Sequence, residues 1–201
     1  MEDMKKRIQQ LLVLSIAAAN LASGASWQID TAHSSAQFAV RHLMVSTVRG
    51  EFGGVKGTAE YDAANLSQAK LDVTIDVATL VTREAKRDAH LKSADFFDVA
   101  KYPQMTFHSK KFERAGQGKL KVTGDLTLHG VTREVTLDVE GPTPELKEEG
   151  GRFRIGAAAT AKIKRKDFGM TWNRIVDAGG VAVSDDVNIT LDVELVRGGT
   201  K

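Results

Sequence analysis

The sequence predicts an all-β protein in which antiparallel strands close into a barrel of about eight strands, with one helical loop inserted. Two observations carry this prediction. Apolar and polar residues alternate over many separate segments with a period of two, the period at which strand side chains change faces. Glycine-containing breaks separate some of these segments, as expected where antiparallel neighbours are joined by tight turns.

The clearest alternation runs from Gly118 to Glu140, which reads GKLKVTGDLTLHGVTREVTLDVE. The break at His129-Gly130 predicts a β-hairpin, because glycine readily adopts the positive φ of a tight turn. Whether the loop has two or four residues, Arg133 shares the apolar face with Leu126 and Leu128. A guanidinium on an apolar face is costly unless its hydrogen bonds are accepted, so Arg133 is a candidate binding residue.

The same period recurs in shorter segments. We expect strands over residues 35–42, 48–54, 58–61, 71–77, 153–163 and 187–195, with another beginning at residue 105. Each has one apolar and one polar face, which suits an antiparallel sheet that is wet outside and dry inside. Arg83–Phe97 differs, because its alanines and dense charges predict a helix or helical loop that lies against the sheet as a lid or plug. Pro142–Gly151 is expected to be a mobile surface loop.

The first 25 residues read as a secretory signal peptide. Lys5, Lys6 and Arg7 form a positive region, residues 11–19 are apolar, and Ser23-Gly24-Ala25 is a small-residue cleavage site. An uncleaved amphipathic anchor is the alternative. The expected division is therefore a signal peptide at 1–25 and one barrel domain at 26–201, exported to the periplasm in a bacterium.

Charge and composition exclude several classes of function. Without the three basic and two acidic residues of the predicted signal peptide, 25 basic and 24 acidic residues remain. This balance gives no general attraction to nucleic acid. The basic cluster of Lys162, Lys164, Arg165 and Lys166 is interpreted as a solvated strand end. The absence of cysteine rules out disulfides and thiolate metal sites.

The small residues expected inside the barrel predict a cavity. Ala157, Ala159 and Ala161 follow one another on one apolar strand face, and Gly124 interrupts another. A barrel of about eight strands either fills with its own side chains or holds one small ligand. Trp27, Trp172 or a phenylalanine from across the barrel could fill this space instead, and the residues alone leave both possibilities open.

The chain from Trp27 onward resembles the YceI-like family of lipocalin-like, polyisoprenoid-binding barrels. The matching residues are Asp30, His33-Ser34, Phe38-Ala39-Val40-Arg41-His42, Val45-Ser46, residues 48–52, 95–99, Tyr102-Pro103, 124–133 and 165–170. The resemblance implies an elongated antiparallel barrel around a long apolar tunnel that is occupied by an isoprenoid or other long-chain lipid. It implies no metal, no cofactor and no catalytic residue.

The predicted ligand-binding residues combine strand parity with this resemblance. They are Phe38, Val40, His42, Phe107, Leu126, Leu128, Arg133, Ala157, Ala159, Phe168 and Trp172. His42 and Arg133 could hydrogen-bond a polar head group, such as a phosphate or a quinone oxygen. Alternatively, Arg133 pairs with a carboxylate such as Asp98 or Asp167, and His42 is structural.

Enzymatic functions have little support. The five histidines show no metal-binding spacing, and the sequence contains neither a GxSxG nor a GxGxxG motif. We therefore expect a non-enzymatic protein that binds a long-chain lipid, a polyisoprenoid or isoprenoid quinone, for carriage, storage or protection. The alternatives are an enzyme acting on such a lipid with His42 as general base, and a stress-induced interaction protein with a packed barrel. Transient membrane contact is expected, and a homodimer is left open.

Overall fold

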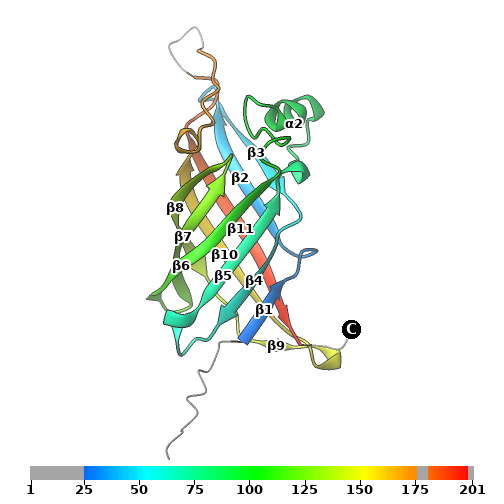
Figure 1. Ribbon diagram of the computed structural model, residues 1–201, viewed down its shortest axis with the longest axis vertical. Coiled ribbons are helices and arrows are strands. Elements are labelled where there is room, and N and C mark those ends of the chain that lie inside the picture. Colours follow the sequence, from blue (N-terminus) through cyan, green and yellow to red (C-terminus); the bar gives the residue numbers. More distant parts are fainter. Residues whose placement is uncertain (1–24, 176–180, 199–201) are drawn as a thin grey trace, which may run out of the picture.

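The structure is a computed structural model that describes residues 25–175 and 181–198 (Figure 1). Within these ranges, eleven strands form one antiparallel sheet. The strands are β1 (Ala25–Ile29), β2 (Ser35–His42), β3 (Ser46–Phe52), β4 (Lys56–Tyr61), β5 (Lys70–Asp76), β6 (Gln104–Gly116), β7 (Lys119–Leu128), β8 (Val131–Glu140), β9 (Leu146–Lys147), β10 (Phe153–Lys164) and β11 (Asp186–Arg197). The described residues also contain one α-helix, α2 (Ala85–Lys92), and the short 3-10 turns η1 (Leu66–Gln68), η2 (Val77–Thr79), η3 (Glu149–Gly151) and η4 (Arg165–Phe168).

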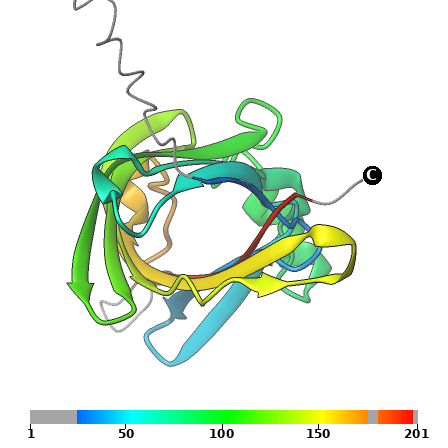
Figure 2. The same ribbon diagram turned by 90° about the horizontal axis from the view of Figure 1, so that it is seen from below.

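Eight strands close into a barrel in the order β1, β4, β5, β6, β7, β8, β10 and β11. The ring closes because β11 pairs with both β10 and β1. Seen from below, these strands surround one central space (Figure 2). The predicted barrel of about eight strands is therefore confirmed.

The remaining strands extend the barrel at its ends. Asn188–Asp192 of β11 pair with β2, whereas Leu195 and Val196 pair with β1. β1 and β2 therefore lie end to end along the same edge of β11. β2 pairs in turn with β3, and the two project at the upper end of the barrel, near α2 (Figure 1).

The predicted hairpin is formed by β7 and β8, which are joined by the two-residue turn His129-Gly130. Both turn residues have positive φ, 51° and 72°. Glycine is also required sterically at position 130, since a Cβ there would lie 2.4 Å from the Tyr102 ring. Leu126 pairs with Arg133 in the register, which places them on one face as predicted.

Two connecting segments complete the frame. The helix expected within Arg83–Phe97 is α2, and the Glu84 side chain caps it by accepting from the backbone nitrogens of Lys86 and Arg87 at 3.1 and 2.6 Å. The prediction of a mobile loop after Pro142 was wrong in part, because that segment contains β9 and η3 and is paired to β10.

The predicted signal peptide lies outside the described residues, except that Ala25 begins β1. None of the helices in residues 25–175 and 181–198 is long and apolar enough to cross a bilayer.

Candidate functional site

A cavity of about 430 Å³ lies within the barrel. All eight barrel strands contribute side chains to it, because the inward positions of each strand are the apolar ones. Examples are Ile29, Ala59, Val73, Phe107, Val122, Leu137, Ile155 and Leu191. On β7 the wall extends from Leu120 to Leu128, which is roughly 27 Å along the strand at about 3.4 Å per residue. The volume of the cavity falls in the range of about 300–1,000 Å³ that is typical of small-molecule sites.

Nine of the eleven predicted binding residues line this cavity. They are Phe38, Val40, His42, Phe107, Leu126, Leu128, Ala157, Ala159 and Trp172. The two alanines open the wall at β10, where Ala159 faces Val139 of β8 and Leu191 of β11 in the register.

Gly124 does not add room. A Cβ there would lie 2.6 Å from the tip of the Phe107 ring, so this phenylalanine already fills the space. The glycine thus accommodates a neighbouring aromatic ring, whereas the alanines border the cavity. This combines the two possibilities that the sequence left open.

Phe168 and Arg133 lie outside the cavity wall, which corrects two predictions. Phe168, in η4, is 2% exposed and packs with Leu128, Ile163 and Met170, while its carbonyl accepts from His129 Nδ1 at 3.1 Å. It therefore belongs to the core at the end of the barrel.

Arg133 has the inward parity that was predicted, but its side chain is exposed. It lies only three residues from the turn of the hairpin, where the side chain reaches solvent, and its Nη1 donates to the Thr132 carbonyl at 3.1 Å. Neither Asp98 nor Asp167 forms an ion pair with it among the described residues.

An aromatic cluster closes part of the cavity near α2. The rings of His90, Phe96 and Trp172 lie 5.0 to 5.1 Å apart, and His90 Nε2 bonds Asp95 Oδ2 at 2.8 Å. Arg87, His90 and Leu91 of α2 all line the cavity. His90 and Leu91 follow Arg87 by three and four residues and therefore lie beside it on the helix surface. The predicted helical lid thus contributes wall residues that the sequence analysis did not name.

Arg165 is a second residue that the sequence analysis missed. It was assigned to a solvated basic cluster, yet its side chain is only 3% exposed and lines the cavity, whereas Lys162, Lys164 and Lys166 are exposed. Burial lowers the pKa of Arg165 from its ordinary value, while the charge of Asp185 opposes this effect. The guanidinium nevertheless remains charged near neutral pH, as arginine does in proteins.

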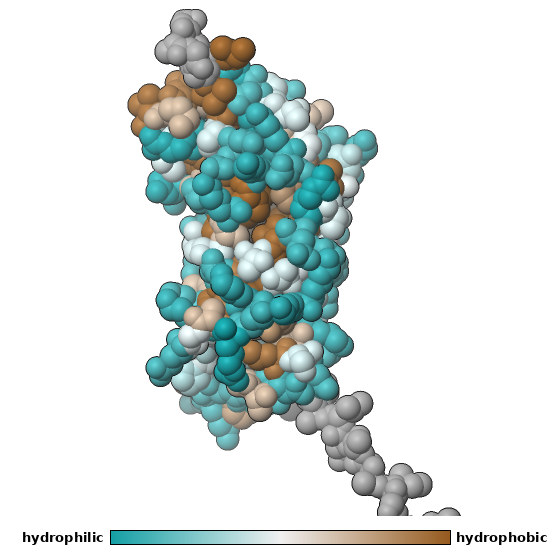
Figure 3. All heavy atoms as spheres, turned by 90° about the vertical axis from the view of Figure 1, so that its left-hand side faces the viewer, coloured by the Kyte–Doolittle hydropathy of each residue, from teal (hydrophilic) through white to brown (hydrophobic). Residues whose placement is uncertain are grey.

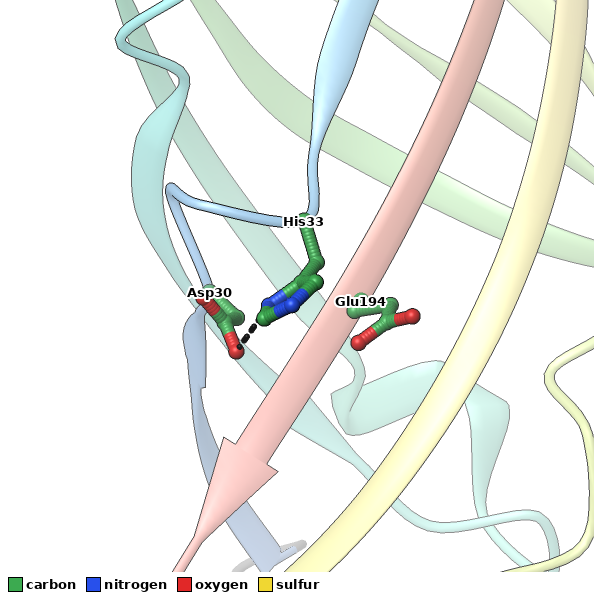
Figure 4. A group of neighbouring side chains, drawn as sticks. All are labelled: Asp30, His33 and Glu194. Carbon is green, nitrogen blue, oxygen red and sulfur yellow. Dashed lines mark hydrogen bonds and ion pairs between the residues drawn. The ribbon is translucent and has the colours of Figure 1, made fainter.

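Asp30, His33 and Glu194 form a second polar cluster, on the barrel's outer side (Figure 4). Asp30 Oδ2 lies 3.0 Å from His33 Nδ1, but it also accepts from Arg154 Nη1 at 2.7 Å, and Arg154 bonds Glu194 as well. The Arg154 guanidinium holds the pKa of Asp30 at about 2. A cation of the chain itself therefore already neutralises these carboxylates, and the cluster joins the β1–β2 turn to β10 and β11.

Apolar side chains are exposed at the upper end of the barrel. Met44 and Val45 in the β2–β3 turn are 55% and 81% exposed, and Ile175 is 83% exposed. Leu43 N donates to the Ala182 carbonyl at 2.9 Å, which joins this turn to the chain near Ile175. Figure 3 shows apolar side chains gathered at this end. We call Leu43, Met44, Val45 and Ile175 the apolar tip.

Comparison with known proteins agrees with this architecture. A family profile described as the YceI-like domain matches residues 27–195. A UPF0312 protein of Vibrio parahaemolyticus is 39% identical over 159 residues, which cover 78% of this chain and 84% of that protein. The crystal structure of a Campylobacter jejuni YceI protein is 38% identical with a TM-score of 0.66, covering 80% of this chain and 89% of that one.

A more distant structure shares the fold alone. It is a polyisoprenoid binding domain from Saccharophagus degradans, implicated in plant cell wall breakdown, at 16% identity and a TM-score of 0.59. The alignment covers 84% of this chain and 97% of that domain.

Proposed function

The chain belongs to the YceI-like family, and from that premise we propose that its barrel binds one long-chain apolar lipid. The ligand class is a polyisoprenoid or isoprenoid quinone, and the protein carries, stores or protects it in the periplasm. The observation that carries the proposal is the apolar cavity, to which every barrel strand contributes. The polyisoprenoid binding domain of Saccharophagus degradans, which shares the fold, supports the same ligand class.

The cavity supplies enough apolar surface for useful affinity. Burying about ten methylenes contributes roughly 8 kcal/mol at about 0.8 kcal/mol each. That corresponds to a dissociation constant near the micromolar range before the costs of association are deducted.

The apolar tip supports a route for loading. Ala182 and Val183 line the cavity and adjoin the tip, because Val183 bridges His42 of β2. Arg41 and Arg174 lie beside the tip, and cations there favour the anionic head groups of a bilayer surface. We propose that the tip touches the membrane transiently while lipid enters or leaves.

A lipid-modifying enzyme with His42 as general base is the second candidate. His42 does line the cavity. Among the described residues, the carboxylates that hydrogen-bond histidines serve His33, His90 and His108, so His42 has no acid that orients it. Binding therefore remains the better-supported function. The cavity also favours binding over a packed barrel that acts only as an interaction protein.

Extraction separates these functions. Exported protein, purified without detergent, is extracted with organic solvent, and the extract is analysed by mass spectrometry at once and after incubation. A stoichiometric intact lipid is expected. A lipid that changes on incubation would favour catalysis, and an empty extract together with no binding of added lipid would favour the packed barrel.

The same preparation tests export. The pattern of Lys5 to Ala25 supports cleavage before a mature chain that begins near Ser26. Intact-mass measurement of protein from the periplasm is expected to give that shorter chain. The proposed location would be refuted if all the protein were recovered in the cytoplasm with residues 1–25 still attached.

A further inference from the structure

The guanidinium of Arg165 is only partly satisfied by the chain. It follows β10 in η4, and three backbone carbonyls fix its position: Nε donates to Ser184 at 3.0 Å, and Nη1 donates to Met170 at 2.6 Å and Trp172 at 2.8 Å. Nη2 is buried and has no hydrogen-bond partner in the part of the chain that the structure describes. A rigidly held side chain in the cavity wall therefore retains unused donors.

The charge of Arg165 is only partly compensated, by Asp185, whose charge acts on the guanidinium without forming an ion pair with it. Its hydrogen-bond partners are carbonyl oxygens, which orient the group but carry no net charge. No carboxylate among the described residues forms an ion pair with it. A buried cation without a directly paired counter-ion is unfavourable unless a ligand supplies one. An anionic oxygen inside the cavity would supply both the missing charge and the missing acceptor.

The arginines of the cavity lining lie toward the same end of the barrel. The strand registers put Arg165 at the end where β10 finishes and β11 begins, with His42, Arg87 and Arg174 also among the lining residues near that end. Glu60 is the carboxylate in the described lining, and it lies at the opposite end, 3.5 Å from Lys70. The lining arginines thus gather where the aromatic cluster and the apolar tip are, whereas the lining lysine, Lys70, pairs with Glu60 at the other end.

We propose that Arg165 Nη2 binds an anionic oxygen on the head of the lipid, a phosphate or a carboxylate. The head then lies at the upper end of the barrel, and the apolar chain runs past Ala159 toward Ile155. This inference rests on the proposed lipid-binding function and deepens it by assigning the head-group class and the orientation. It differs from the sequence-based prediction, in which Arg133 and His42 were the candidates for a head-group role.

Matched pairs of probes test the head-group preference. The full exported chain, freed of lipid, is titrated with geranylgeranyl monophosphate and geranylgeraniol, and with oleate and oleyl alcohol. Within each pair only the head differs. Charge-assisted hydrogen bonds to Nη2 are expected to make at least one acidic probe bind about 10- to 100-fold more tightly than its alcohol. The acid that gains more identifies phosphate or carboxylate as the head.

Two variants assign that preference to Arg165. Arg165→Met should reduce the preference for the acidic probe to near unity while the alcohol still binds. Arg49→Met is the matched control, because Arg49 is exposed on β3 and does not line the cavity, and it should retain the full preference. A folded Arg165→Met protein with the preference intact would overturn the proposal.

Because Arg165 also holds three carbonyls, its variant could fail to fold, and a measurement on the wild-type chain avoids this problem. Arginine side-chain NMR should show the Nη2 signals of Arg165 shifting when geranylgeranyl monophosphate binds, and shifting less with geranylgeraniol. Unchanged Nη2 signals in the saturated phosphate complex would overturn the inference. Equal binding of acid and alcohol would also overturn the inference, but it would leave lipid binding in place. Failure of all four probes to bind would instead refute the lipid-binding function itself.

Discussion

Ala159→Phe tests the cavity most directly. Ala159 lies in the wall at the middle of β10, between Val139 and Leu191 in the register. A phenyl ring there would occupy space that about six ligand methylenes could fill. At about 0.8 kcal/mol each this is ~5 kcal/mol, so the dissociation constant for a long-chain lipid should rise more than a thousandfold.

Stability should change little in the same variant. Overpacking a full core costs about 1 to 3 kcal/mol, but a ring that enters a cavity of about 430 Å³ meets little resistance. Because 1 kcal/mol shifts Tm by about 2–4 °C in a chain of this size, we expect Tm to remain within about 4 °C of the wild type. Lipid titration and thermal melts on the same preparation measure both quantities.

Ala158→Phe is the matched control, since Ala158 is the neighbouring residue and is exposed on the outer face of β10. It should leave lipid affinity unchanged. Full lipid binding by Ala159→Phe would show that the ligand does not pass β10. A drop in Tm well beyond the expected range would mean that the barrel is packed at this point.

Three further changes probe the rest of the molecule. Arg133→Met should alter stability by no more than about 0.5 kcal/mol and leave lipid affinity unchanged, because the side chain is exposed; a tenfold loss of affinity would return Arg133 to the site. The pKa of Asp30 is about 2 against an ordinary 3.8, so its ion pair with Arg154 stabilises the fold fully above about pH 4, and this contribution is lost as the pH falls toward 2. Asp30→Asn should remove that part of the acid sensitivity in denaturant melts, and an identical pH profile would contradict it. Met44→Ser combined with Val45→Ser should slow lipid transfer from anionic vesicles without changing affinity for lipid in detergent, and unchanged transfer would exclude the apolar tip from loading.

Most of the barrel could be predicted from the sequence because the strand period is local information. β7 and β8 could be predicted because apolar and polar residues alternate on both sides of a turn that needs positive φ at Gly130. β1 was missed, because its five residues follow directly on the predicted cleavage site and only tertiary contacts with β4 and β11 define it as a strand. β9 was missed for the same reason, since its two residues are a strand only through their pairing with β10.

The cavity wall was predictable where it follows strand parity, and not where it depends on packing. Ala157 and Ala159 were identified because small residues on an inward face leave room. Arg87 and His90 were not, because their place in the wall depends on how α2 docks near Trp172, which no sequence period records. The prediction that Gly124 leaves room in the barrel was wrong for a related reason, since the ring that fills this space comes from Phe107 on the adjacent strand.

Arg133 and Arg165 show what strand parity alone can and cannot predict. Arg133 has inward parity but lies beside a hairpin turn, so its long side chain escapes to solvent. Arg165 continues the inward-facing series of Ala159, Ala161 and Ile163. It was assigned to a solvated basic cluster because exposed lysines alternate with it in the sequence. Beyond it the chain folds back over the barrel end, and carbonyls of Met170, Trp172 and Ser184 hold the guanidinium inside. Strand parity therefore identifies the charged residues whose side chains can face inward. Whether such a side chain stays buried depends on whether the chain folds over the end of its strand. Of these two arginines, only the buried Arg165 requires an anionic partner.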